Sequence, residues 1–137
     1  PLSIVHGDFN PANFLYENGQ VSALIDWEAS RVGDPREDLG WMVLMDVYSN
    51  THVMDYPKKE GGFLAYYNKL TGNDITPEEL GYFMLFGTME IAVPVQQFVA
   101  RRVHKEFTLL LPLYVAQTSM AVLPAMAQAM GYMGVSA

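Results

Sequence analysis

The stretch HGDFNPANFLYENGQVSALIDWE, residues 6 to 28, gathers a histidine, carboxylates and asparagines around one predicted turn. Asn18-Gly19 is the strongest two-residue hairpin signal, because both positions tolerate a positive φ. Residues 14 to 17 and 20 to 25 are therefore expected to pair as antiparallel strands. Apolar residues alternate along the second strand, which predicts that at least one of its faces is buried. These residues are Val21, Ala23 and Ile25.

Helical signals follow the hairpin, and a short apolar run that favours a strand precedes it at Leu2 to Val5. Asp34-Pro35-Arg36-Glu37 predicts a helix start, with aspartate as the cap, proline at the first position and glutamate reaching back. Thr76-Pro77-Glu78-Glu79 carries the same kind of signal. The helices are expected at 34 to 49, at 58 to 70 with Gly72 terminating it, at 76 to 103 with a kink at Pro94, and at 106 to 130. The expected fold is α+β: a small β-hairpin unit followed by about four mostly apolar helices.

The 137 residues are 50% hydrophobic and 17% charged, which indicates one globular domain over residues 1 to 137 and excludes a disordered chain. The formal net charge of −7 argues against a nucleic-acid partner. An acidic protein can still bind a nucleotide when a metal ion lies between them. The absence of cysteine excludes a disulfide scaffold and a thiolate zinc site.

Residues 107 to 137 contain no charged side chain, so a membrane span must be weighed. Polar residues and two prolines interrupt the segment, and no basic cluster flanks its far end. A buried core helix is therefore favoured over a membrane helix. No signal peptide is visible, and a cytoplasmic location is expected.

The spacing His6-x-Asp8-x-x-x-x-Asn13 has the Asp-to-Asn interval of the protein-kinase catalytic loop. A phosphoryl acceptor hydroxyl needs an oxygen base, and Asp8 can be that base. The amide oxygen of Asn13 is a hard, neutral ligand of the kind Mg²⁺ prefers. Asp26 ends a predicted strand and takes the place of the metal-binding aspartate of kinases. The hairpin is expected to bring Asn13 and Asp26 to the same end of the structure.

Together HGDFNPANFL, ALIDWE and GDPREDLGW resemble the aminoglycoside phosphotransferase and choline kinase family, small-molecule kinases distantly related to protein kinases. The wording DWE…GDPREDL is also similar to the phosphotransferase-like domains fused to some acyl-CoA dehydrogenases. The motifs cover residues 2 to 41, and the remainder is matched only by its helical, apolar character. The resemblance implies the C-terminal lobe of a protein-kinase-like fold, with residues 1 to 33 as the catalytic loop and metal-binding hairpin and 34 to 137 as a helical subdomain.

The same resemblance implies ATP and Mg²⁺ as cofactors and a small-molecule hydroxyl as acceptor. Its implied site residues are Asp8 as catalytic base, His6 as organiser of the loop, Asn13 and Asp26 as Mg²⁺ ligands, and Asp38 as the brace of the loop. Glu28 is open between a metal or substrate group and a solvated side chain. Asp34 is expected only to cap a helix, and Trp27 and Trp41 are expected in the core.

Only five residues precede His6, and the first is not methionine, so a fragment is expected in which the N-terminal nucleotide lobe is absent. Alone, such a chain should have negligible kinase activity, with the missing lobe as its partner. Its uncovered apolar surface would favour self-association into a homo-oligomer. The alternatives are a non-enzymatic kinase-like remnant that serves as an interaction module, a membrane-embedded helical pair, and a hydrolytic metal site built from His6, Asp8 and Asp26.

Overall fold

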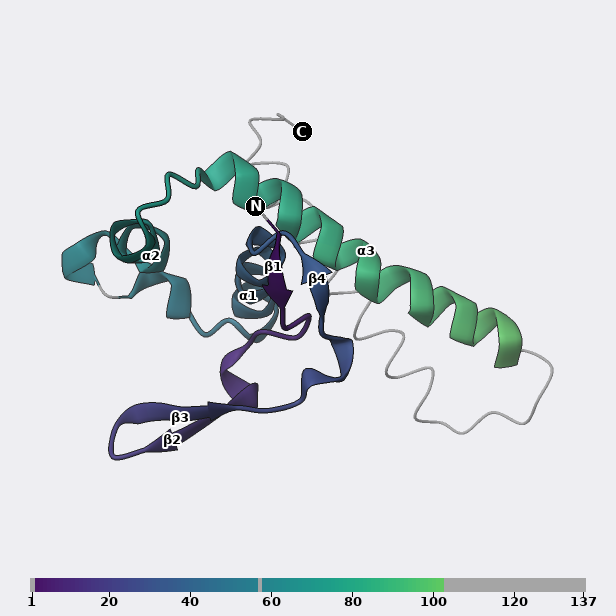
Figure 1. Cartoon of the computed structure of the whole chain (residues 1–137). Coiled ribbons are helices and arrows are strands. Elements are labelled where there is room, and N and C mark those ends of the chain that lie inside the picture. Colours follow the sequence, from purple (N-terminus) through teal and green to yellow (C-terminus); the bar gives the residue numbers. More distant parts are fainter. Residues whose placement is uncertain (1, 57, 103–137) are drawn as a thin grey trace.

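The structure is a computed structural model that describes residues 2–56 and 58–102 (Figure 1). This part of the chain has an α+β fold, in which two antiparallel strand pairs are followed by three α-helices. The strands are β1 (Ser3–Val5), β2 (Phe14–Glu17), β3 (Gln20–Leu24) and β4 (Arg31–Gly33). The α-helices are α1 (Arg36–Ser49), α2 (Phe63–Thr71) and α3 (Pro77–Arg102). Short 3₁₀ helices are η1 (Pro11–Asn13), η2 (Trp27–Ala29), η3 (Val53–Asp55) and η4 (Lys58–Glu60).

The β2–β3 hairpin forms at the predicted turn. Asn18 and Gly19 have φ values of 51° and 78°, as the turn requires, and Glu17 pairs with Gln20. The predicted buried face is wrong, because Val21 and Ile25, which were expected on it, are 50% and 41% exposed, and Ala23 between them is exposed as well. Figure 1 shows the hairpin extending away from α1 and α3. Alternation in sequence separates the two faces of a strand, but it does not show that anything covers either of them.

The second sheet pairs β1 with β4, and β4 was not predicted. Ser3 lies opposite Gly33 and Val5 opposite Arg31. The three residues of β4 show no alternation of apolar and polar side chains, so the sequence carries no strand signal there. They form a strand because their backbone groups pair with those of β1. Val5 is fully buried, which anchors this sheet to the core.

The helix boundaries follow local hydrogen bonds. Asp34 accepts the backbone N–H of Arg36 at 2.9 Å, and Glu37 accepts that of Asp34 at 2.9 Å, so the predicted contacts at the start of α1 form. The helix itself begins one residue later than predicted, at Arg36, with Pro35 in the cap position. At α3, Glu79 accepts the backbone N–H of Thr76 at 2.8 Å, and Thr76 accepts that of Glu79 at 3.3 Å.

One predicted helix begins at a different residue, and another lies outside the described residues. The second helix begins at Phe63 and not at residue 58, because positive φ values at Gly61 and Gly62 separate it from η4. It ends at Gly72, as predicted. The third helix continues through Pro94 to Arg102. The fourth expected helix, 106–130, and the segment 107–137 lie outside the described residues.

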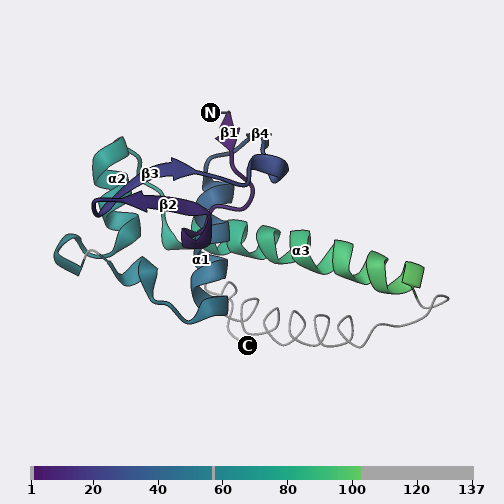
Figure 2. The same ribbon diagram turned by 90° about the horizontal axis from the view of Figure 1, so that it is seen from below.

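The core is formed where α1 packs across α3, which both views show (Figures 1 and 2). A Cβ added at Gly40 of α1 would lie 2.5 Å from the backbone carbonyl carbon of Phe83, so the two backbones almost touch. The buried apolar cluster consists of Leu39, Val43, Leu44, Ile75, Leu80 and Met84. Within residues 2–56 and 58–102, no helix has the length and apolar character that crossing a membrane requires.

Candidate functional site

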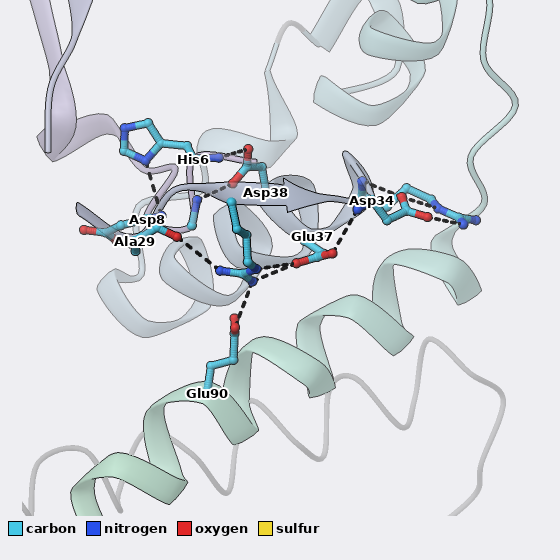
Figure 3. Close-up of polar contacts among 10 residues, drawn as sticks. His6, Asp8, Ala29, Asp34, Glu37, Asp38 and Glu90 are labelled. Atoms are coloured by element: carbon cyan, nitrogen blue, oxygen red, sulfur yellow. Dashed lines mark hydrogen bonds and ion pairs between the residues drawn. The ribbon is translucent and has the colours of Figure 1, made fainter. Parts of the chain in front are cut away.

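The loop after β1 is held by the carboxylate of Asp38 on α1. Its two oxygens accept the backbone N–H groups of His6, at 2.8 Å, and of Gly7, at 2.9 Å (Figure 3). Gly7 has a φ of 84°, and a Cβ there would lie 2.4 Å from the carbonyl oxygen of Ala29. The loop therefore passes between α1 and η2 with space only for glycine.

The imidazole of His6 links this loop to the end of the hairpin. The side chain is 2% exposed, and its Nε2 lies 2.8 Å from the carbonyl oxygen of Ile25. Its Nδ1 accepts the backbone N–H of Asp8 at 3.3 Å. With the proton on Nε2, both contacts are satisfied at once, because Nε2 donates and Nδ1 accepts. The ring of Trp27 packs against it, with ring centroids 4.5 Å apart.

The carboxylate of Asp8 is surrounded by nitrogen donors. Its Oδ1 accepts from Nδ2 of Asn10 at 2.8 Å and from Nε1 of Trp41 at 2.8 Å. Its Oδ2 accepts from Nδ2 of Asn13 at 2.8 Å. Neutral donors of this kind orient a carboxylate without adding a counter-charge, so Asp8 has a defined position in the loop.

Asn13 is 9% exposed and ends η1, one turn after the start of the loop. Its Nδ2 donates to both the carbonyl oxygen of Asp8, at 2.9 Å, and Oδ2 of the same residue. Both amide hydrogens are thereby used, and among the hydrogen bonds of the described residues none ends on its Oδ1. That oxygen remains available as a ligand.

Asp26 follows directly after the open end of the hairpin, opposite the Asn18-Gly19 turn. The backbone N–H of Ile25 donates to the carbonyl oxygen of Asn13 at 3.0 Å, so the two predicted ligand residues flank the same backbone pairing. Asp26 itself is exposed and has a left-handed backbone, with φ 64° and ψ 56°. Glu28, in η2, is also exposed. Aspartate tolerates this conformation better than most residues, and the turn redirects the chain away from β3.

Residues 2–56 and 58–102 contain no group of three His, Asp or Glu side chains placed to hold a metal ion. His6, Asp8 and Asp26 therefore do not form the hydrolytic metal site that was one alternative. A ligand set that includes the amide oxygen of Asn13 is a different arrangement.

An ion-pair network that the sequence did not reveal connects β4 to both long helices. Nη2 of Arg31 lies 2.7 Å from Oε2 of Glu37 and 2.8 Å from Oε1 of Glu90. Figure 3 shows Glu37 and Glu90 converging from the two helices. Arg31 and Glu90 are 59 positions apart in sequence, so no local pattern could indicate the contact.

Of the two tryptophans expected in the core, Trp41 is partly buried and packs against the core cluster, whereas Trp27 does not. Trp27 is 45% exposed, so its assignment to the core is wrong, and its Nε1 donates to the carbonyl oxygen of Leu24 at 2.9 Å. Trp41 is half-buried and reaches Asp8, a role that sequence reasoning missed. A signal existed: Trp41 lies three residues after Asp38, on the helix face that meets the loop.

A pocket of about 230 Å³ borders the same loop. It lies between η1 and the second half of α1, and its carboxylate, Asp46, already accepts the backbone N–H of Val53 at 2.6 Å. Its lining residues are Asn10, Pro11, Ala12, Met42, Met45, Asp46, Ser49, Thr51 and Val53. Only Asn10 is shared with the Asp8 cluster, so the pocket adjoins the cluster and is mostly apolar.

Comparison with known proteins gives a family match over the same region. Residues 1–78 match the model of the phosphotransferase enzyme family, APH. A stretch of 62 residues is 31% identical to YcbJ of Bacillus subtilis (strain 168), described as an uncharacterized protein. That stretch covers 44% of this chain and only 20% of the length of YcbJ. No solved structure was found to match the chain.

Proposed function

Because the chain belongs to the phosphotransferase enzyme family, we propose that it is the catalytic lobe of an ATP-dependent enzyme that phosphorylates a hydroxyl group of a small molecule. The observation that carries the proposal is the pairing of Asp8 with Asn13. Asp8 is a carboxylate held in a fixed position, where it can act as a base. Asn13 donates both amide hydrogens to Asp8, so its amide oxygen stays available as a ligand. A base beside a hard oxygen ligand is what phosphoryl transfer to a hydroxyl needs.

The proposed roles follow from these contacts. Asp8 takes the proton of the acceptor hydroxyl as the hydroxyl oxygen bonds to phosphorus and the bond from phosphorus to the ADP oxygen breaks. Asp38 and His6 keep the loop in the shape that presents Asp8. Neither would contact the acceptor in this proposal, so both act through the loop.

The donor set at the base of the hairpin fits Mg²⁺. Asn13 supplies an amide oxygen and Asp26 a carboxylate, and both are the hard oxygen ligands that this ion prefers. Bound there, the ion would neutralise charge on the phosphates of ATP. The exposure of Asp26 leaves its carboxylate accessible to such a partner.

The groups that bind the nucleotide phosphates are proposed to come from another part of the protein. The 137-residue sequence has no glycine-rich loop and strand lysine ahead of His6, and these groups hold the phosphates in kinases. The chain alone is therefore proposed to have negligible activity. Exposed apolar side chains on the β1–β4 sheet and just before it support a covering lobe: Leu2, Ile4 and Val32 are 80%, 71% and 72% exposed.

The acceptor is proposed as a class only. The net charge of −7 suits a cationic acceptor such as an aminoglycoside or choline, whereas the DWE…GDPREDL wording suits a hydroxyacyl compound. Both belong in the acceptor panel, and a cytoplasmic location is part of the proposal, because that is where ATP is supplied.

The test is ATP turnover by the full-length protein across that panel. Asp8→Asn should lower kcat by about a hundredfold to ten-thousandfold, because the base is lost while the shape is kept. Asp26→Asn should lower turnover and raise the Mg²⁺ concentration needed for half-maximal rate. The matched control is Glu17→Gln, an exposed acid beside the turn at the other end of the hairpin. Equal rates for the wild type and Asp8→Asn would remove Asp8 as the base.

A second candidate, an interaction module without activity, is favoured by the same exposed apolar residues. It predicts no turnover with any acceptor and a concentration-dependent oligomer in sedimentation experiments. Changing Ile4 and Val32 to serine should then dissociate the oligomer.

A further inference from the structure

The hydrogen bonds around Asp8 are distributed unequally between its two oxygens. A carboxylate offers about four acceptor positions, two on each oxygen. Both positions on Oδ1 are occupied, by Nδ2 of Asn10 and Nε1 of Trp41. Within the described residues, Oδ2 has one donor, Nδ2 of Asn13. The open position on this carboxylate is therefore on Oδ2, next to Asn13.

We infer that Trp41 is a positioning residue that closes Oδ1 of Asp8 and leaves Oδ2 as the atom that takes the proton of the acceptor hydroxyl. The inference rests on the proposed function, and it adds which atom of the base reacts and what decides this. Because the free amide oxygen of Asn13 lies beside that position, the acceptor hydroxyl would meet the nucleotide phosphates on the Oδ2 side of Asp8.

Trp41 is suited to this role because its indole ring is fixed by packing against α3. It lies on α1 in the same helix as Asp38, so one rigid element fixes both the loop backbone and the Asp8 side chain. On its other side, a Cβ added at Gly87 of α3 would lie 3.2 Å from Cε3 of Trp41, so the indole packs closely on α3. The orientation of Asp8 is thereby tied to the packing of α1 on α3.

An indole donor also differs from a side-chain amide in what it can do. The N–H of tryptophan only donates, so Trp41 cannot change roles and release Oδ1 by turning an acceptor toward it. The amide of Asn10 is held in its orientation as well, because its Oδ1 accepts the backbone N–H of Ala12 at 2.9 Å. Both residues therefore occupy Oδ1 of Asp8, and Trp41 is the one of the two that connects this oxygen to α1.

The first experiment observes the contact itself, in the 137-residue chain labelled with ¹⁵N. Only two indole N–H signals exist, and Trp27→Phe identifies that of Trp41 by elimination. Asp8→Ala should move the Trp41 signal upfield and speed its hydrogen exchange by at least about tenfold, because a charge-assisted bond is lost. Asn10→Ala removes the other Oδ1 donor and should leave that exchange slow. A Trp41 indole whose shift and exchange ignore Asp8→Ala would overturn the inference.

The second experiment measures turnover by the full-length protein. Trp41→Phe keeps an aromatic ring and removes the donor, so kcat should fall about tenfold to a hundredfold with the KM for the acceptor within about twofold. Tyr48→Phe, on the exposed side of α1, is the matched control. The double variant Asp8→Asn/Trp41→Phe should be no slower than Asp8→Asn alone, because the indole acts only through Asp8.

The outcomes separate the two claims. An impaired Asp8→Asn variant beside a fully active Trp41→Phe variant, or losses that multiply in the double variant, would overturn the inference and leave the proposed function standing. An Asp8→Asn variant as active as the wild type would overturn the proposed function and the role of Trp41 with it, while the indole signals would still report the contact.

Discussion

The carboxylate of Asp38 accepts the backbone N–H of Gly7 at 2.9 Å, although the two residues are 31 positions apart. Its other oxygen accepts the neighbouring N–H of His6. A single side chain on α1 therefore satisfies two consecutive backbone donors that the loop itself leaves unpaired. Backbone donors withdrawn from water need such partners, so the shape of the loop depends on this helix.

Replacing Asp38 by alanine should lower the free energy of unfolding by about 2 to 4 kcal/mol, because two partly buried donors lose their acceptor. Chemical denaturation measures the loss, and amide hydrogen exchange at His6 and Gly7 should accelerate. Asp46→Ala is the matched control: this acid, on the same helix, accepts the backbone N–H of Val53 at 2.6 Å. It should destabilise the chain while leaving exchange at His6 and Gly7 unchanged. Slow exchange at both amides in Asp38→Ala would contradict the bracing role.

Gly7→Ala should be one of the most damaging single changes in the chain. The residue has a φ of 84°, and the added methyl would lie 2.4 Å from the backbone oxygen of Ala29. Strain and overpacking together should cost about 3 kcal/mol or more. Gly19→Ala separates the two causes, because its φ is 78° but no atom lies within 4 Å of the added Cβ. It should cost only about 1 to 2 kcal/mol in thermal or urea unfolding. Equal losses for both variants would show that crowding at Gly7 is unimportant.

Asp34 should make stability depend on pH in acid. Its hydrogen bonds with the Arg36 guanidinium are the main reason that the pKa of this carboxyl lies below its usual value of 3.8. A carboxyl with a lowered folded-state pKa stabilises the fold above its unfolded-state pKa, and this contribution is lost as pH falls through the folded value. Asp34→Asn should therefore cost about 1 kcal/mol at pH 7 and little in strong acid, where the carboxyl of the wild type is protonated in the folded state.

Urea unfolding at both pH values measures this difference, with the exposed Asp74→Asn as control. The control should track the wild type at each pH. A stability gap between Asp34→Asn and the wild type that is as wide in acid as at neutrality would rule out ionisation of Asp34 as the cause.

Gly40→Ala should destabilise the chain even though alanine is the better helix former by about 1 kcal/mol. The added Cβ would lie 2.5 Å from backbone of Phe83, so α1 and α3 must separate. We expect a net loss of about 1 to 3 kcal/mol in denaturant unfolding. At Gly87 the nearest atom to an added Cβ is the Cε3 atom of Trp41, at 3.2 Å, and a side chain can shift. Gly87→Ala should therefore cost less, and a stabilised Gly40→Ala variant would contradict the close approach.

Sequence by itself determined the features that depend on neighbouring residues. The Asn18-Gly19 turn, the helix start at Asp34 and the reciprocal cap at Thr76 were all predictable, because each depends on backbone bonds within four residues. The motif spacing likewise indicated the family that the match over residues 1–78 shows.

The tertiary structure decided the features that depend on contacts between residues far apart in sequence. The hairpin that alternation predicted to be half-buried is exposed, and Trp27, expected in the core, lies at the surface. The contact of Trp41 with Asp8 spans 33 positions, and that of Arg31 with Glu90 spans 59. Hydrophobic pattern reports which side of an element can be buried, whereas only the packed chain determines which partner reaches it.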